Sequence, residues 1–234
     1  MPETHFNPIG SSPRCALVTG GFGTLGTAVT EAFLREGYRV ARVNHAAVPT
    51  SAASANSIGI GPIDLANCEE AREAVATALT RLGALHVVVN AAGGFAWEVL
   101  SDTSPATWAP LHALNVQTCL NTCVAALPHL KDGSRIINIG AMAEAGAGMG
   151  AYTAAKSAVA RLTESLAAEV RTRGVTVNAV LPGTIDTPQN RRSMPDTEPA
   201  HWTRPEAIAE VILFLASPAS HAINGALIPV TNAC

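Results

Sequence analysis

Residues 15–26 read CALVTGGFGTLG, a short apolar run that leads into a glycine-rich turn. The run Cys15–Val18 is typical of a buried strand. Apolar residues then recur at positions 25, 29, 32 and 33, which predicts a helix that ends before Gly37. The next apolar stretch, residues 38–43, predicts a second strand. Strand, glycine turn, helix and strand together form one βαβ unit.

The turn contains the spacing G-x-G-x-x-G at Gly21, Gly23 and Gly26. Glycines at a strand-to-helix junction permit a tight turn, and the helix N-terminus offers free N–H groups to a pyrophosphate. The same spacing also occurs by chance in plain loops. Its position early in an α/β pattern favours dinucleotide binding. The predicted cofactor contacts in this turn are Gly20, Gly21, Phe22, Gly23, Leu25 and Gly26.

Length and composition limit the possible classes of protein. The chain has 234 residues, 48% of them hydrophobic, and a formal net charge of −3. It has no basic stripe that would indicate nucleic acid or an anionic membrane, and no apolar run long enough to span a bilayer. Five cysteines without a scaffold pattern predict free thiols in a reducing compartment, so we expect a cytoplasmic protein without a metal site. Residues 1–13 are expected to form a flexible arm before a single domain, 14–234.

Strand and helix patterns alternate along the rest of the chain. Five further strands are predicted at 58–63, 85–89, 134–139, 175–180 and 226–230, and further helices at 67–82, 105–130, 152–170 and 205–216. Seven apolar strands that alternate with helices predict an α/β fold, a Rossmann-like doubly wound parallel sheet. Ligands bind such sheets at the carboxyl ends of the strands, so residues that follow the strands are the candidates for a site.

The second strand is followed by Asn44 and His45, where an acidic residue would select NAD through the adenosine ribose. Asn44 can bond the ribose without repelling a 2′-phosphate, and Arg42 or His45 could attract one. This favours NADPH weakly over NADH; alternatively, Arg42 is simply solvated. Further cofactor contacts are predicted at Asp64 and Leu65 and along Asn90, Ala91, Ala92 and Gly93, where small side chains would let the backbone lie against a flat ring.

Tyr152 and Lys156 are four residues apart on a predicted helix, so they lie on the same face. A tyrosine titrates near ~10, and an adjacent ammonium lowers that pKa. The pair could therefore transfer a proton near neutral pH. On an arbitrary helix, two surface residues would be the simpler interpretation. The preceding strand, glycine turn and strand ends favour the catalytic one.

Residues 183–204 show no clear periodicity and are rich in proline, threonine and arginine. Irregular segments of this length in a compact domain are usually lids or disordered. We interpret the segment as a substrate lid, with Met194 and Trp202 toward the substrate. The predicted cofactor contacts around its start are Pro182, Gly183, Thr184, Ile185 and Thr187.

In combination, these motifs resemble the short-chain dehydrogenase/reductase family over about residues 14–232. The resemblance implies that Tyr152 is the proton donor or acceptor and that Lys156 lowers its pKa and holds the nicotinamide ribose. It also implies that Asn115 positions a water that relays protons to Lys156. The family commonly forms tetramers through the helices of Asn115 and Tyr152, so a homo-oligomer, dimer or tetramer, is expected.

One departure from the family pattern bears on the substrate. The family normally has a serine after the fifth strand, about thirteen residues before the tyrosine, and here Ala141 stands in that place. A carbonyl reductase uses that hydroxyl to hold the substrate oxygen, and losing such a donor costs about 10²–10³ in rate. Ordinary alcohol dehydrogenation is therefore disfavoured.

A narrower resemblance, to quinonoid dihydropteridine reductases, fits the missing serine. It rests on the glycine turn, Gly140-Ala141, Gly94 followed by Phe95, and above all the run 181–195 with Trp202. It implies reduction of a quinonoid dihydropterin or a similar conjugated ring, with Ala141, Phe95, Met194 and Trp202 near the substrate. The alternatives are a reductase of a small ketone or ketoacyl thioester, with Thr153, Thr184 or water replacing the serine, and a non-catalytic NADP(H)-binding protein.

Overall fold

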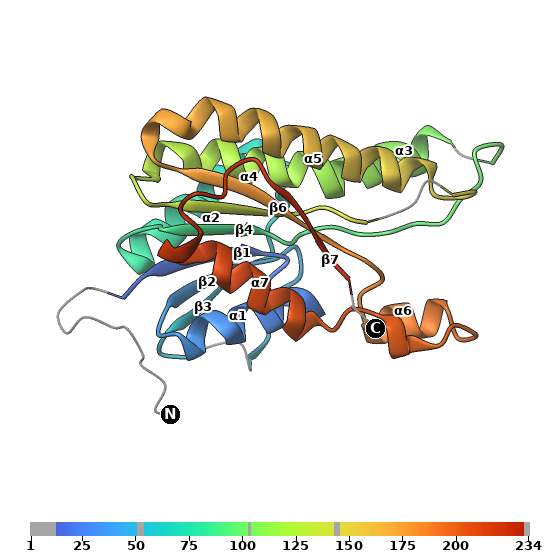
Figure 1. Ribbon diagram of the computed structural model, residues 1–234, viewed down its shortest axis with the longest axis horizontal. Helices are drawn as coiled ribbons and strands as arrows, with labels where there is room; N and C mark the ends of the chain where they lie inside the picture. The colour runs from blue at the N-terminus through green and yellow to red at the C-terminus, as the bar shows by residue number, and fades with distance from the viewer. Residues whose placement is uncertain (1–12, 51–53, 103, 143–145, 232–234) are drawn as a thin grey trace.

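The computed structural model describes residues 13–50, 54–102, 104–142 and 146–231 (Figure 1). The expected flexible arm, 1–13, lies almost wholly outside these residues. Seven parallel strands form one sheet in the order β3-β2-β1-β4-β5-β6-β7, which confirms the doubly wound single domain. The strands are β1 (Cys15–Thr19), β2 (Arg39–Val43), β3 (Ser57–Ile60), β4 (Val87–Asn90), β5 (Arg135–Ile139), β6 (Thr176–Pro182) and β7 (Leu227–Val230).

Helices cover both faces of the sheet and enclose two hydrophobic cores (Figure 1). One face carries α1 (Thr24–Arg35) and α7 (Pro205–Ala216), and the other carries α2 (Cys68–Leu82), α4 (Thr118–Ala126) and α5 (Gly150–Val170). Every residue of β1, β4 and β5 is buried, as expected for central strands covered on both sides. None of the helices in the described part of the chain is long and apolar enough to cross a membrane.

The long helix predicted over 105–130 is not continuous. It consists of α3 (Pro105–His112), a π-helical turn η2 (Ala113–Gln117), α4, and a 3₁₀ turn η3 (Leu127–His129). A single widened turn does not change the apolar pattern enough to be seen in the sequence. Such turns often occur at functional sites, and this one carries Asn115.

Two other expectations need correction. The third strand ends at Ile60 rather than residue 63, because Pro62 has no N–H to donate to a ladder. The segment 183–204 was predicted to be irregular but contains α6 (Pro188–Ser193) and a 3₁₀ turn η5 (Pro199–His201). Thr187 caps α6 by accepting a hydrogen bond of 3.0 Å from Asn190 N, and Pro188 occupies the first helical position. Both are helix-start signals that the sequence contained. With the helix at 105–130 divided and α6 added, the five predicted helical ranges become seven α-helices in the described chain.

Candidate active site

The glycine turn lies between β1 and α1, at the point where the order of the strands reverses. Gly20 has a φ of +63°, and a Cβ there would come within 2.8 Å of the Ala91 carbonyl oxygen. A Cβ on Gly26 would lie 2.2 Å from the Gly20 carbonyl oxygen. The turn therefore requires glycine at both positions, and its backbone approaches β4 and α1 as closely as a dinucleotide site needs.

Arg42 stabilises this turn, a role that its sequence position did not reveal. Its Nε donates a 2.9 Å hydrogen bond to the Gly21 carbonyl, and its guanidinium lies 5.0 Å from the centre of the Phe22 ring. Burial lowers the pKa of Arg42. The interpretation of Arg42 as simply solvated is therefore wrong.

The residues predicted after β2 and β3 lie at the same edge of the sheet. Asn44 Oδ1 accepts a hydrogen bond of 3.2 Å from Ala46 N, and His45 is exposed. Asp64 is also exposed, and the carbonyl of the buried Leu65 accepts a 3.0 Å bond from Asn121.

The segment after β4 is fixed to the glycine turn and faces the catalytic candidates. Thr19 Oγ1 accepts a 3.0 Å hydrogen bond from Ala92 N, which joins the ends of β1 and β4. A Cβ on Gly93 would come within 2.8 Å of Asn115 Oδ1 and 3.3 Å of Lys156 Nζ. Only glycine leaves this face open, which fits the close approach of a nicotinamide ring. The participation of Thr19 was missed, although a hydroxyl directly before the turn was visible in the sequence.

Asn115 is buried, and its amide is held by the backbone. Nδ2 donates to the carbonyls of Gly94 at 3.0 Å and Leu111 at 2.9 Å, while Oδ1 accepts from Gly94 N at 3.2 Å. The side chain thus fixes the loop after β4 against the π-helical turn. This geometry places Asn115 next to Lys156 across Gly93.

Lys156 lies beneath Tyr152 on α5, as the four-residue spacing predicted. Its Nζ donates a 2.9 Å hydrogen bond to the Ile139 carbonyl at the end of β5, and lies 5.9 Å from the centre of the Tyr152 ring. Lys156 is buried, and Tyr152 is half-buried. The hydrogen bond to Ile139 therefore fixes Lys156, and with it Tyr152, relative to the end of β5.

The pKa values of the pair differ from the expectation. Burial raises the pKa of Tyr152, whereas the sequence suggested that Lys156 would lower it. Burial also lowers the pKa of Lys156 to about 8. The nearby Cys119 raises this pKa, but its effect is smaller than that of burial. Desolvation dominates because both side chains are withdrawn from water, and the Lys156 ammonium lies over the Tyr152 ring while it is bonded to the Ile139 carbonyl. A tyrosine that retains its proton is suited to donating it.

Alanine stands in the place of the expected serine, and an aromatic ring contacts Tyr152. Ala141 follows β5 and brings no hydroxyl to the site. Thr153, one suggested replacement, donates a 2.9 Å bond to the Met149 carbonyl of its own helix. Phe95 lies edge-on to Tyr152 with ring centres 4.9 Å apart, and Trp97 lies 6.1 Å from Phe95.

A buried row of amides beneath this site was also missed by sequence reasoning. Asn90 Nδ2 donates to Asn138 Oδ1 at 2.9 Å, and Asn138 Nδ2 donates to Thr163 Oγ1 at 2.9 Å. The row joins the end of β4 to β5 and α5. Asn138 is one residue before Ile139, so the row supports the carbonyl that receives the Lys156 bond.

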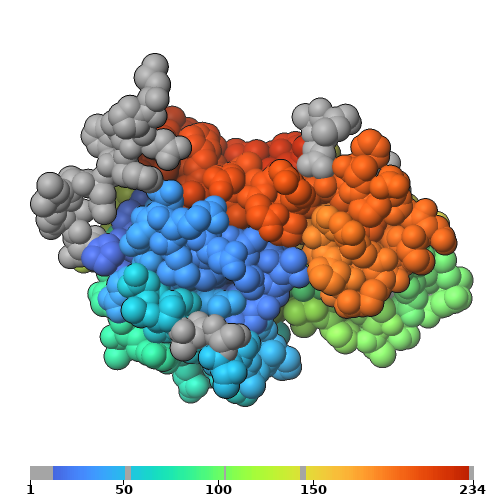
Figure 2. All heavy atoms as spheres, turned by 90° about the horizontal axis from the view of Figure 1, so that it is seen from below, coloured from blue at the N-terminus to red at the C-terminus, as the bar shows by residue number. Residues whose placement is uncertain are grey.

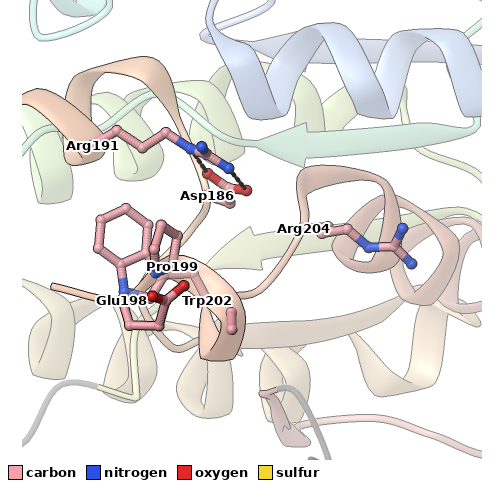
Figure 3. Close-up of a pocket in the computed structure, with 7 residues that line it drawn as sticks. Asp186, Arg191, Glu198, Pro199, Trp202 and Arg204 are labelled. Carbon is pink, nitrogen blue, oxygen red and sulfur yellow. Dashed lines mark hydrogen bonds and ion pairs between the residues drawn. The ribbon is translucent and has the colours of Figure 1, made fainter.

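Residues 183–204 follow β6 and project at the same end of the molecule as α3 in both views (Figures 1 and 2). Two backbone hydrogen bonds join the two ends of the segment. Thr203 N donates one of 2.8 Å to the Thr184 carbonyl, and Asp186 N donates one of 2.9 Å to the Thr203 carbonyl. Arg191 binds the Asp186 carboxylate through two hydrogen bonds of 2.6 and 2.7 Å (Figure 3).

The remaining predicted residues lie along the same segment. Pro182 is the last residue of β6. Gly183 N donates a hydrogen bond of 3.3 Å to the Val230 carbonyl, and Ile185 forms an isolated parallel β-bridge with Thr203. Met194 follows α6. Trp202 is buried and lines a pocket of ≈430 Å³ within the segment, together with Asp186, Arg191, Glu198, Pro199, Ala200 and Arg204 (Figure 3).

The sequence profile of the short chain dehydrogenases matches residues 14–198. The chain belongs to this family. A probable galactose dehydrogenase of Rhizobium meliloti is 34% identical over 226 residues, 90% of this chain and 83% of that protein. An acetoacetyl-CoA reductase of Shinella zoogloeoides is 31% identical over 232 residues, 92% of this chain and 95% of that protein.

Solved structures agree with this assignment. A short-chain dehydrogenase/reductase from Serratia marcescens superposes with a TM-score of 0.84 and 28% identity, covering 93% of this chain and 96% of that one. The short-chain dehydrogenase is thus an oxidoreductase of a family that binds NAD(P)(H). This supports the enzymatic alternatives over the non-catalytic one.

Because Lys156 titrates at about 8, we expect the affinity for NADH to fall as the pH rises through that value. The ammonium that would hold the ribose is present below the pKa and is lost above it. Fluorescence titration with NADH between pH 6 and pH 10, about two pH units on either side of the Lys156 pKa, measures the change in affinity. Lys156→Arg should abolish the decline, because arginine stays charged. Lys131→Arg, at an exposed lysine, is the matched control and should keep the decline of NADH affinity with pH. An NADH affinity that does not change with pH in the unmodified chain would contradict the role of the Lys156 ammonium at the ribose.

Proposed function

We propose that this short-chain dehydrogenase is an NAD(P)H-dependent reductase of a quinonoid dihydropterin or a similar conjugated ring. The observation that carries the proposal is the pairing of Tyr152 with the Phe95 ring, 4.9 Å away, in a chain whose Ala141 brings no hydroxyl to the place of the family's serine. Aromatic side chains offer planar substrates a surface for stacking or edge contact. The exposed Trp97 extends that surface.

The residues at the site divide the work of such a reduction. The reduced nicotinamide, when bound, supplies a hydride. The backbone at Gly93 and the turn at Gly20–Gly26 would hold the cofactor, and Lys156 would bind its ribose while bonded to the Ile139 carbonyl. Tyr152 would give its proton to a ring nitrogen, so the substrate gains one hydride and one proton.

The missing serine is consistent with this substrate class. Hydride addition to a ketone creates an alkoxide, which needs a positioned donor. Hydride addition to a conjugated imine places charge on ring nitrogens, which Tyr152 can protonate directly. A site with Ala141 therefore loses less with a pterin than with a ketone.

A small ketone or ketoacyl thioester is the second candidate. It is favoured by the relatives, one named an acetoacetyl-CoA reductase and one a probable galactose dehydrogenase. In that case Thr184 or a water would replace the serine, since the Thr153 hydroxyl is bonded to its own helix. Both candidate reactions use Tyr152 and Lys156. They differ in whether the substrate needs a hydroxyl at position 141.

A substrate panel tests the proposal. NADH and NADPH oxidation is measured with quinonoid dihydropterin, dihydrobiopterin, acetoacetyl-CoA and simple ketones. We expect the unmodified chain to prefer the quinonoid dihydropterin, and Ala141→Ser to raise the ketone-to-pterin ratio of kcat/KM by about tenfold or more. Ala141→Gly, which adds no hydroxyl, is the matched control and should leave the ratio unchanged. A preference for the ketones in the unmodified chain would favour the second candidate.

For the cofactor we propose a preference for NADPH, supported by Asn44 in place of an acidic residue after β2. Asn44→Asp should shift the preference toward NADH, because the added charge repels a 2′-phosphate. The ratio of the two dissociation constants, from fluorescence titration, measures the shift. Equal NADPH affinity before and after the change would place the 2′-phosphate away from Asn44.

The segment 183–204 is proposed to act as the substrate lid, with Met194 and Trp202 on it. Its closed base at Thr184 and Thr203 supports movement of the segment as a unit. A cytoplasmic homodimer or homotetramer, paired through α4 and α5, is the proposed assembly. The exposed Val124 on α4 is consistent with such a contact.

A further inference from the structure

A second pocket lies where β5 and β6 begin, at the edge of the sheet opposite the candidate active site. Its volume is ≈490 Å³, and its lining includes Arg135, Thr176, Asp132, Arg171 and His221. Arg135 opens β5 and Ala141 follows its end, so at about 3.3 Å per residue the two sites are roughly 20 Å apart. The pocket therefore takes no part in the reduction proposed above.

Arg135 is the unusual residue of this pocket. It is only 5% exposed, and its Nε is buried without a hydrogen-bond partner among the described residues. Nη1 donates 3.1 Å to the Ser134 carbonyl, but no described carboxylate forms an ion pair with the guanidinium. Burial is the main cause that lowers the pKa of Arg135, and Arg14 adds to it, while Asp132 and Tyr38 act in the opposite direction. A buried cation without an ion pair is costly, and an anion would remove that cost.

Thr176 supplies a second orphaned group at the same place. It is 7% exposed, and its Oγ1 is buried without a partner in the described part of the chain. Arg135 and Thr176 are Cα partners in the β5–β6 ladder, so their side chains extend on the same face of the sheet. A guanidinium N–H beside a hydroxyl can bind one anionic oxygen.

The rest of the lining is compatible with a bound anion. Arg171 and His221 are exposed at the pocket, and Asp132 is its one carboxylate. The Asp132 carboxylate lies against Gly174, where a Cβ would come within 1.9 Å of Oδ1. Arg135 and Arg171 together outweigh the single negative charge of Asp132, so the lining carries an excess of positive charge.

We propose that this pocket binds a small anion, a carboxylate or a phosphate, through Arg135 Nε and the Thr176 hydroxyl. Inorganic phosphate and succinate are the probes for the two sources. Each is titrated calorimetrically into the full chain at constant ionic strength, with NADH saturating so that the cofactor site is filled. We expect one of the two to bind at millimolar concentrations with a stoichiometry of one.

Variants then locate the binding. Arg135→Met should weaken it by about tenfold or more, and Thr176→Val, which keeps the shape, by a smaller factor. Arg161→Met, a surface arginine on α5 paired with Glu164, is the matched control and should bind like the unmodified chain. Unchanged NADH affinity confirms that each variant is folded. If Arg135→Met does not fold, Thr176→Val and Arg171→Met carry the test.

Two results would overturn the proposal. One is the absence of binding of either anion at millimolar concentrations, which would mean that water alone satisfies Arg135. The other is equal affinity in the unmodified chain and in the Arg135 and Thr176 variants, which would place the anion elsewhere.

Discussion

The hydrogen bond from the buried Lys156 ammonium to the Ile139 carbonyl is the interaction on which the candidate site depends. It joins α5 to the end of β5 and so fixes where Tyr152 stands relative to the carboxyl edge of the sheet. The amides of Asn90 and Asn138 hold the same strand ends from beneath. Both amide N–H₂ groups donate within this network and tie the ends of β4 and β5 to α5, while Asn90 Oδ1 has no hydrogen-bond partner in the described part of the chain.

Most of the fold could be predicted from the sequence because the strands are buried on both faces and separated by clear helical periodicity. The glycine turn, the strand ends and the Tyr152–Lys156 spacing placed the site at one edge by topology alone. The π-helical turn at Asn115 could not be predicted, because one extra residue in a turn leaves the apolar pattern almost unchanged. The helix α6 could have been predicted from Thr187 and Pro188.

The electrostatics of the site depend on three-dimensional burial, which local spacing does not contain. Sequence spacing suggested that Lys156 lowers the pKa of Tyr152, whereas desolvation raises it. Because its pKa is raised, Tyr152 keeps its proton at neutral pH, which is the form that a proton donor requires. Arg42 shows the same limit: its bond to Gly21 became visible only when β2 and the glycine turn were placed side by side.

The central claim is that Tyr152 donates the proton from a site assembled around Lys156. The most direct measurement is single-turnover reduction by Tyr152→Phe, with NAD(P)H affinity measured on the same preparation and with the best substrate of the unmodified chain. The account predicts that turnover falls by about 10²–10⁴-fold, the usual contribution of a positioned acid, while cofactor affinity stays unchanged. Unchanged turnover in the phenylalanine variant would contradict it.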